Sequence, residues 1–480
     1  MAQKEINKKT VVLGAGPAGL NVGRGMLPCS VSVDILERES YAGGLCRTFE
    51  DNGYFFDLGP HNIHTNKENI YLFLKSILGD QLIQNSPKIN IFFNGRFVPY
   101  PLKGIWVFKV LGNPWRVFCA FADFLFARIL MFVRKPKKEK SFRDWITNRF
   151  GRTLYSIYFE PYAQKAWKIS SDEISTYVAE KRVPLLSIRD HIRMALKLSP
   201  KTFHSEDWAK IKSYYPHFGV GQITGFLAGS FLETGGKIHL GINILEVKRD
   251  GSRIEYVRYM ENREEKTLPV DFLFSTIPIN DFIKLIRPYP PEDVLQAAAG
   301  LDFCSERLLY IKVNKETVFD SMLVYFQSPE IKFNRVYDLR RFSPYCVPLS
   351  KDAICIEFTC SYGDNIWNAS DKELFEEAML VFEKNKMLSR SSIEGFLTKE
   401  VVHAYPRFRI GFQNRLDTIF NYLKDIENII TFGRQGLFCY ANLDDVLDMS
   451  FKVAQSNVIN SRSKIDYDYL FYEYLNLSRV

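Results

Sequence analysis

The chain has 480 residues, which is enough for about three domain-sized units of roughly 150 residues each. Hydrophobic residues make up 46% of the chain and charged residues 25%, which excludes a disordered, collagen-like or fibrous protein. The net charge of +8 is too dilute over this length to indicate nucleic-acid binding, but it is compatible with an anionic small substrate or an anionic membrane surface.

The eight cysteines are scattered, with no Cys-x-x-Cys pair and no histidine pair at zinc spacing. This pattern predicts neither a disulfide framework nor a metal site. The first ten residues are polar and lead directly into an expected strand, so no signal-peptide apolar region is expected. These features favour a cytoplasmic protein.

Residues 10–13 form a short apolar run that predicts the first strand, and a helical pattern follows through residue 26. A second apolar run at residues 31–36 predicts the next strand. Strand, glycine-rich turn, helix and strand together make a βαβ unit of the kind that binds a dinucleotide.

Each glycine in this turn is expected to have a steric role that a larger residue could not take. Gly14 makes the tight turn, Gly16 lets the backbone approach a pyrophosphate, and Gly19 lets the helix pack closely on the strand. The pyrophosphate is expected at the helix N-terminus, where free amide groups favour negative charge. Glu37, at the end of the second strand, is expected to accept hydrogen bonds from a ribose and to oppose a 2′-phosphate.

A second glycine turn follows at Gly43 and Gly44, with Arg47 close behind it. This combination suits a larger diphosphate whose far end reaches into the protein, so the expected cofactor is FAD.

Residues 66–214 are expected to form a mainly helical cap, with a strand-like insert at residues 89–99. Within it, residues 106–133 are rich in large apolar side chains and precede a basic run. Three interpretations stay open: a buried helix followed by a solvated loop, a helix lying in a membrane interface, or a membrane span. Residues 106–140 are therefore the candidate for a peripheral membrane contact.

Strands are expected again at residues 237–240, 244–249, 272–276 and 428–432, and a final helix from Asp444. The expected fold class is α/β, with a discontinuous Rossmann-like FAD-binding domain built from residues 1–65, 215–278 and 398–480. A helical cap (66–214) and a mixed α+β substrate region (279–397) are inserted between these segments.

Four separated segments also resemble one flavoprotein family, and they occur in matching order. They are Asp57–Thr65 (Asp-Leu-Gly-Pro-His-Asn-Ile-His-Thr), Pro161–Trp167 (Pro-Tyr-Ala-Gln-Lys-Ala-Trp), Lys181–Pro184 (Lys-Arg-Val-Pro) and Gly433–Asp444. In these segments the chain resembles the UDP-galactopyranose mutases, within the wider superfamily of amine oxidases and protoporphyrinogen oxidase-like proteins.

The resemblance implies a role for several residues. His61 would lie beside the flavin ring, and Arg182 would hold a substrate phosphate as a bidentate clamp. Tyr162 and Trp167 would line the sugar site. Tyr440 would contact a phosphate or the ribityl chain, and Gly433 with Arg434 the flavin pyrophosphate.

The chain departs from the mutase pattern at several positions. Ile63 replaces an aromatic residue, Phe438 stands where the mutases have a phosphate-binding tyrosine, and Asn442 replaces an acid. Cys304 lies near the expected position of a second phosphate-binding arginine, and whether Arg307 substitutes for it is open.

The leading hypothesis is a flavoenzyme of nucleotide-sugar metabolism in surface polysaccharide biosynthesis, either a pyranose/furanose mutase or a relative that changes the sugar by redox chemistry. The alternative is an FAD-dependent oxidase or desaturase of an apolar, porphyrinogen-like or isoprenoid-like substrate at a membrane surface. A flavin-binding protein without enzyme activity is the third hypothesis. The partner is expected to be a small molecule and not nucleic acid, and the oligomeric state is open.

Overall fold

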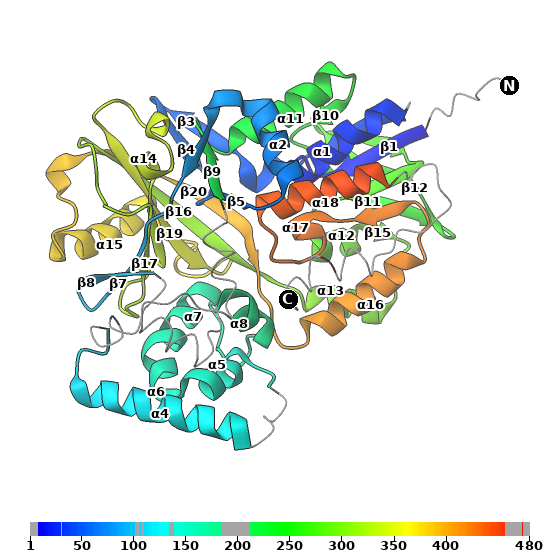
Figure 1. Ribbon diagram of the computed structural model, residues 1–480. Coiled ribbons are helices and arrows are strands. Elements are labelled where there is room, and N and C mark those ends of the chain that lie inside the picture. Colours follow the sequence, from blue (N-terminus) through cyan, green and yellow to red (C-terminus); the bar gives the residue numbers. More distant parts are fainter. Residues whose placement is uncertain are drawn as a thin grey trace.

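A computed structural model describes residues 8–29, 31–100, 106, 110–133, 139–183, 212–456 and 473. Figure 1 shows three regions: a parallel sheet with flanking helices near the N-terminal strand, a large mixed sheet at the other end, and a helical cap below. The α/β fold class expected from the sequence is confirmed.

The first region is a five-stranded parallel sheet with strand order β10-β2-β1-β14-β21. Its strands are β1 (Lys8–Leu13), β2 (Val31–Leu36), β10 (Lys237–His239), β14 (Phe272–Ser275) and β21 (Ile429–Thr431). This order is the Rossmann arrangement, and each strand was expected from its apolar run. Three separated parts of the chain therefore build one sheet.

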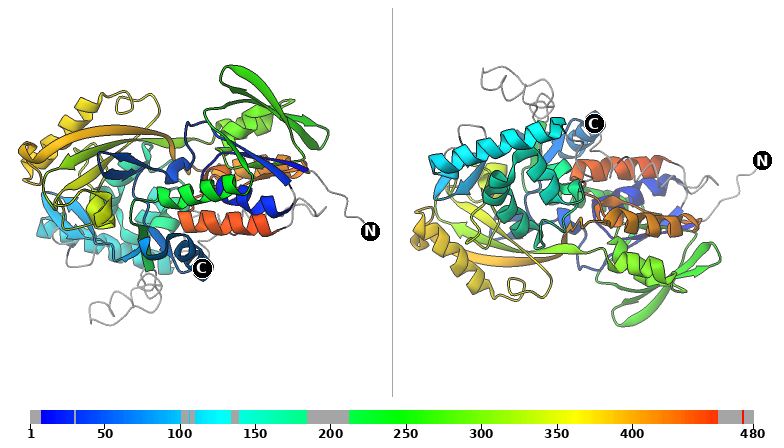
Figure 2. Two further views of the ribbon diagram at one scale, coloured as in Figure 1. Left: turned by 90° about the horizontal axis from the view of Figure 1, so that it is seen from above. Right: turned by 90° about the horizontal axis from the view of Figure 1, so that it is seen from below.

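Both faces of this sheet are covered, because its central strands are apolar on both sides. Helices α1 (Pro17–Met26), α11 (Gly221–Glu233) and α18 (Leu443–Gln455) lie on one face (Figure 2). The other face meets a four-stranded sheet of β11 (Asn243–Asp250), β12 (Arg253–Glu261), β13 (Glu264–Pro269) and β15 (Ile286–Arg287). The cover on both faces holds the β1–α1 turn in a fixed place.

The second region is a seven-stranded sheet with strand order β20-β16-β19-β18-β17-β7-β8. Its strands are β7 (Ile89–Phe93), β8 (Arg96–Pro99), β16 (Phe303–Val313), β17 (Leu323–Phe326), β18 (Arg335–Asp338), β19 (Asp352–Cys360) and β20 (Ile393–Pro406). One face packs on α15 (Asp371–Lys384). The opposite face of this sheet packs on β3 (Thr48–Asp51) and β4 (Tyr54–Asp57), so this second face lies toward the Rossmann region.

The helical cap follows β8 in the chain and lies along the lower edge in Figure 1. It contains α4 (Pro114–Val133), α5 (Phe142–Phe150), α6 (Arg152–Leu154), the π-helical turn η4 (Tyr155–Phe159), α7 (Glu160–Trp167) and α8 (Thr176–Arg182). Among the described residues, no helix combines the length and the apolar character needed to cross a bilayer. That finding includes α4, which is the described helix of the segment 106–133.

Shorter elements connect these regions. They are β5 (Ile63–Thr65), α2 (Glu68–Leu78), β6 (Leu82–Asn85), β9 (Lys212–Pro216), α12 (Ile279–Leu285), α13 (Glu292–Ala299), α14 (Leu339–Phe342), α16 (Phe412–Lys424), α17 (Gly433–Gly436) and the 3₁₀ turns η1 (Leu27–Cys29), η2 (Gly44–Cys46), η3 (Gly79–Gln81), η5 (Pro344–Cys346) and η6 (Arg390–Ser392). Strands β5, β9 and β6 pair into a further, three-stranded sheet.

Two details differ from the expected segments. The strand-like insert at residues 89–99 is the hairpin β7–β8, but it joins the seven-stranded sheet and not the cap. Strand β20 runs along β16 on both sides of residue 398, where the last FAD-binding segment was expected to begin. Chain order alone does not reveal such pairings, because β7 pairs with residues 234 positions later and β16 with residues 80 to 103 positions later.

Candidate active site

The turn between β1 and α1 depends on its glycines. Gly14 has a φ of +97°, and its amide donates to the carbonyl oxygen of Leu36 at 2.8 Å. A Cβ on Gly19 would lie 1.9 Å from the carbonyl oxygen of Gly14, so only glycine allows this approach. Gly16 precedes α1, and no side chain caps that helix. The helix N-terminus is therefore shaped to receive an anionic group.

Glu37 lies beside this turn and is 8% exposed. One carboxylate oxygen accepts from the amide of Ala15 at 2.7 Å, and the other accepts from the amide of Glu39 at 2.9 Å. A carboxylate has about four acceptor positions, so ribose hydroxyls can bind the remaining ones.

The second glycine turn lies directly against the first. The amide of Gly43 donates to the carbonyl oxygen of Ala15 at 2.8 Å. Gly43 and Gly44 have φ values of +117° and +54°, and a Cβ on Gly44 would lie 3.1 Å from the Cα of Gly16. The two turns thus leave an edge without side chains, as a diphosphate requires.

Arg47 follows the second turn, where its guanidinium lies 3.9 Å from the ring centroid of Tyr41. It also lies 3.8 Å from the carboxylate of Glu39. Burial lowers the pKa of Arg47. These contacts hold Arg47 close to the glycine turns, and its bond to a phosphate stays a prediction.

The third segment reaches the same place through Gly433, at the start of α17. Gly433 has a φ of +82°, and a Cβ there would lie 3.0 Å from the Cβ of Ala18 in α1. The C-terminal segment therefore closes on the N-terminal βαβ unit next to the expected pyrophosphate position.

His61 lies in the loop between β4 and β5. Its Nδ1 is 2.9 Å from the carbonyl oxygen of Gly59, and because a carbonyl only accepts, Nδ1 is the protonated nitrogen. Burial is the main cause that lowers the pKa of His61 to about 4, and the positive charges of Arg434 and Arg335 contribute to this shift. The ring is therefore neutral at pH 7, with Nε2 left as an acceptor.

A group of polar side chains surrounds this loop; we call it the tyrosine–arginine cluster, and it consists of Arg335, Glu357, Tyr405, Arg434 and Tyr440. Arg335 pairs with Glu357, and its Nη2 donates to the hydroxyl oxygen of Tyr405 at 2.8 Å. The guanidinium of Arg434 lies 4.8 Å from the ring of Tyr405 and 5.5 Å from that of Tyr440. Both arginines thus lie near His61, from different regions of the fold.

Two buried acids lie on the same sheet face as Arg335. Glu357 is 0% exposed and Glu306 is 4% exposed, and the Oε1 atom of each has no hydrogen-bond partner. Burial is the main cause that raises the pKa of Glu306 to about 8, and the charge of Glu357 contributes to this shift. Glu306 is therefore mainly protonated at pH 7 and offers a hydroxyl donor to a ligand.

Strand alternation decides the open question about Arg307. Adjacent residues of a strand point to opposite faces, so Arg307 points away from Glu306 and the cluster. Its guanidinium donates to the carbonyl oxygens of Trp367 and Ala369 at 2.7 and 2.8 Å and pairs with Asp371 at 2.8 Å. Arg307 anchors the start of α15, and it does not replace a phosphate-binding arginine.

Tyr162 extends the cluster into the cap. It lies on α7 and makes an edge contact with Tyr325 of β17, with ring centroids 5.7 Å apart. Burial acts to lower the pKa of Arg335, but Glu357 and the hydroxyls of Tyr325 and Tyr162, among others, raise it overall. Tyr162 therefore lies close to the cluster, and its contact with a substrate stays a prediction.

Trp167, at the end of α7, has a different environment. It is 8% exposed, and its ring meets that of Phe408 edge-on at 6.2 Å. The residue therefore packs between the cap and the rest of the protein, and its contact with a sugar stays a prediction.

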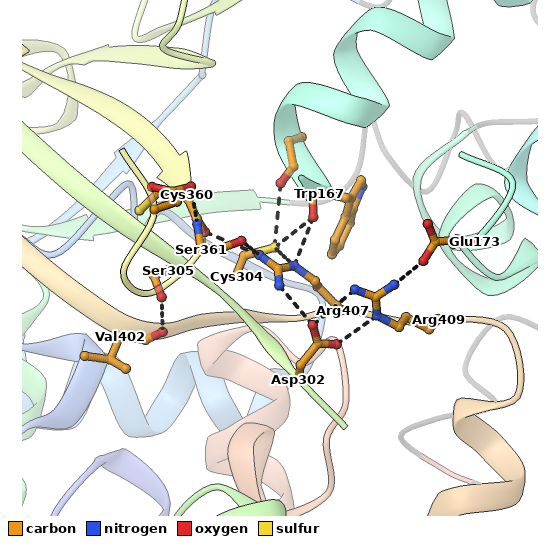
Figure 3. A network of polar contacts seen from close by, with 12 residues as sticks. Trp167, Glu173, Asp302, Cys304, Ser305, Cys360, Ser361, Val402, Arg407 and Arg409 are labelled. Carbon is orange, nitrogen blue, oxygen red and sulfur yellow. Dashed lines mark hydrogen bonds and ion pairs between the residues drawn. The ribbon is translucent and has the colours of Figure 1, made fainter. Parts of the chain in front are cut away.

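Arg407 and Arg409 fasten the cap to the seven-stranded sheet (Figure 3). Arg407 donates through Nε to the carbonyl oxygen of Trp167 at 3.0 Å and through Nη1 to Asp302 at 2.9 Å. Arg409 pairs with Asp302 and with Glu173 of the cap. Sequence patterns did not reveal this network, because its members come from three distant segments.

The remaining predicted positions are placed as follows. Arg182 is the last residue of α8, and its side chain lies outside the described residues. Phe438 is fully buried and makes an edge contact with the ring of Phe303 at 5.0 Å, so it does not belong to the cluster. Asn442 caps α18, where it exchanges hydrogen bonds with Asp445.

Comparisons with known proteins connect this geometry to flavoproteins. Residues 12–77 match the model of an NAD(P)-binding Rossmann-like domain. The structure of a reduced UDP-galactopyranose mutase is similar with a TM-score of 0.78 and 18% identity, covering 95% of this chain and 98% of that one. A protein from Exiguobacterium sp. 255-15 assigned as protoporphyrinogen oxidase is similar with a TM-score of 0.74 and 15% identity, covering 95% and 100%.

Curated sequences match over shorter stretches. A lycopene-forming phytoene desaturase from Pseudescherichia vulneris is 24% identical over 339 residues, which are 64% of each chain. The matched stretches span between 11% and 64% of the relatives' own lengths. The chain has the fold of the FAD-dependent, amine-oxidase-like flavoproteins. That fold and the three glycine segments support FAD as the cofactor.

The residues of this flavoprotein also fit FAD sterically. A side chain on Gly14, Gly19, Gly44 or Gly433 would collide with a neighbouring segment or strain the backbone, so the diphosphate edge stays bare. Glu37 has acceptor positions left for the adenosine ribose, and that contact stays a prediction. The far end of a cofactor bound along this edge would extend toward His61 and the tyrosine–arginine cluster.

Proposed function

We propose that this flavoprotein is an enzyme acting on a nucleotide-diphosphate sugar, as a pyranose/furanose mutase or as a sugar-modifying redox enzyme in surface polysaccharide biosynthesis. The observation that supports this most is the tyrosine–arginine cluster. Buried guanidinium groups bind phosphate oxygens in a planar, bidentate geometry. Tyrosine and carboxyl groups suit the hydroxyls of a sugar, whereas an apolar substrate would leave them unpaired.

The residues divide between the two parts of such a substrate. Arg335 and Arg182 would bind the substrate diphosphate, with Tyr440 beside it, and Arg434 keeps its expected place at the flavin pyrophosphate. Tyr162 would contact the sugar from the cap. Bound FAD supplies the reactive ring and, when reduced, a nucleophilic nitrogen, so the protein's own task is binding, orientation and water exclusion.

His61 would act on the flavin through its backbone more than through its ring. The Nδ1–H group is already bonded to Gly59, and a second donor would require protonation of Nε2. Burial opposes that protonation at neutral pH, as the low pKa shows. The backbone amide beside the ring position is then the group available to stabilise negative charge on it.

The test uses dithionite-reduced holoenzyme incubated with UDP-galactopyranose and UDP-galactofuranose, with the products separated by chromatography. Interconversion by the reduced protein and none by the oxidised protein is expected for a mutase. A calorimetric titration with UDP checks the nucleotide site separately. If UDP does not bind, the nucleotide-sugar proposal fails.

A second candidate is an oxidase or desaturase of an apolar substrate. It is favoured by the exposed apolar residues of α4 in the cap, and it agrees with the partial likeness to a phytoene desaturase. In that case oxidised flavin accepts a hydride from the substrate. Anaerobic bleaching of the flavin by a porphyrinogen or a carotenoid precursor, together with no UDP binding, would select this candidate.

A further inference from the structure

Helix α4 exposes an apolar face along its whole length. Eight of its large apolar residues are between 37% and 74% exposed: Trp115, Phe118, Phe121, Leu125, Phe126, Ile129, Leu130 and Val133. At about 100° per residue these positions cover one half of the helix surface. Soluble proteins rarely expose such a contiguous apolar surface without a partner.

The other side of α4 is fixed to the cap. Ala120 and Ala127 are each 7% exposed, and a Cβ on Gly151 would lie 2.8 Å from the backbone carbon of Asp123. The carboxylate of Asp123 accepts from the amide and the hydroxyl of Thr153 at 2.9 and 2.6 Å. The helix therefore presents its apolar face outward as a firmly held ridge, at the outer edge of the molecule (Figures 1 and 2).

Apart from Asp123, the charged residues in the sequence from 114 to 138 are all basic. Asp123 is the sole acid in the sequence between residues 114 and 138, and its carboxylate is bonded inside the cap. Arg116 is exposed, and the sequence after the helix contains Arg134, Lys135, Lys137 and Lys138. A basic, apolar surface is complementary to anionic lipid headgroups and the acyl boundary beneath them.

We propose that α4 docks this protein on an anionic lipid bilayer, lying in the interface with its apolar face inserted. The helix has 20 residues but is packed sideways on α5 and α6, so its length lies along the surface and does not cross it. A second copy is a poorer occupant, because a two-fold interface would bring the same basic residues together. The proposal does not depend on which substrate the flavin site binds.

The first experiment is co-sedimentation of the full-length holoenzyme with vesicles. Binding to vesicles of 70% phosphatidylcholine and 30% phosphatidylglycerol is expected, with at least about tenfold weaker binding to pure phosphatidylcholine. High salt should weaken the binding to the anionic vesicles.

The decisive variant replaces Phe121, Phe126 and Ile129 with Ser. All three side chains are exposed, so the variant should keep its flavin spectrum and thermal stability while losing at least about tenfold in vesicle affinity. The matched control replaces Leu349, which is 88% exposed and lies outside the cap, with Ser, and it should bind vesicles like the wild type. The single change Phe126→Ser serves the same test if the triple variant folds poorly.

A separate variant replaces the four basic residues at 134, 135, 137 and 138 with Gln. It should lose the preference for phosphatidylglycerol and keep any weak binding to phosphatidylcholine. The proposal is overturned if wild type binds neither vesicle type or if the Ser variant binds as well as wild type. It is also overturned if light scattering shows a lipid-independent dimer that the Ser variant dissociates.

Discussion

Glu306 and Glu357 place two carboxyl groups on one buried sheet face, together with the guanidinium of Arg335. Replacing Glu306 with Gln should make stability less dependent on pH. Burial raises the pKa of Glu306 from an ordinary value of about 4.3 to about 8. A raised pKa means that its contribution to stability is fully present below about pH 4 and is lost as the pH rises through about 8.

Relative to the Gln variant, the wild type should therefore lose free energy of unfolding, on the order of 4 kcal/mol, between pH 5 and pH 9. Urea unfolding of both proteins at several pH values measures this difference. Parallel stability profiles would mean that Glu306 ionises normally in the folded protein.

Gly19→Ala should abolish the retention of FAD. The new Cβ would overlap the carbonyl oxygen of Gly14, so the glycine turn has to move and the diphosphate loses its amide donors. Gly229→Ala is the matched control, because no atom lies within 4 Å of a Cβ there and alanine suits a helix interior. Flavin absorbance after gel filtration distinguishes them, and equal retention would disprove the steric argument.

At the scale of single residues, the glycines of the two turns were predictable from the sequence, because a glycine motif indicates a positive φ and a close approach of two backbones. The roles of the buried acids were not predictable in this way. Glu306 and Glu357 come to lie on one buried sheet face only when β16 and β19 pair. Arg335 and Tyr405 join them from two further strands, β18 and β20. Alternation along residues 303–313 was the one available signal, and it separates Glu306 from Arg307.

At the scale of elements, the cap depends on a polar anchor at the end of α7. Arg407→Met should lower the free energy of unfolding by about 2–4 kcal/mol, because Arg407 is 7% exposed and its bonds to Trp167, Asp302 and Ser361 would all be lost. Chemical denaturation measures the loss.

Arg390→Met is the control for this change. Arg390 pairs with Glu376 and Glu383 at the surface, where ion pairs contribute about 1 kcal/mol or less. A similar effect of both substitutions would show that burial does not distinguish the two arginines.

The type of most elements followed from the sequence, but their surroundings did not. Residues 114–133 have an apolar composition that also suits a buried helix. Composition alone does not predict which other elements will pack on a helix and bury its surface. The buried-helix interpretation is wrong for the outer face of α4, because α5 and α6 cover one side only. The hairpin β7–β8 was expected as strands, yet its sheet is completed by residues more than two hundred positions later.

For the whole molecule, the proposed substrate site joins three regions. Tyr440 comes from the last Rossmann segment, Arg335 from the seven-stranded sheet and Tyr162 from the cap. A ligand that bridges them binds the folded state alone, so UDP at 100 times its dissociation constant should add about 2.7 kcal/mol to the free energy of unfolding. The expected observation is a single thermal transition that moves to higher temperature with increasing UDP.

Arg182→Ala should remove this stabilisation without removing FAD. Loss of a charge-assisted bidentate contact costs about 2–4 kcal/mol, or roughly 30- to 1,000-fold in affinity, and Arg182→Lys should recover only part of it. Arg390→Gln is the control for a lost surface charge and should respond to UDP like the wild type. If UDP stabilises Arg182→Ala as strongly as the wild type, the arginine clamp is wrong. If UDP stabilises neither protein, the nucleotide-sugar proposal gives way to the apolar-substrate oxidase, because no bridging nucleotide then holds the three regions together.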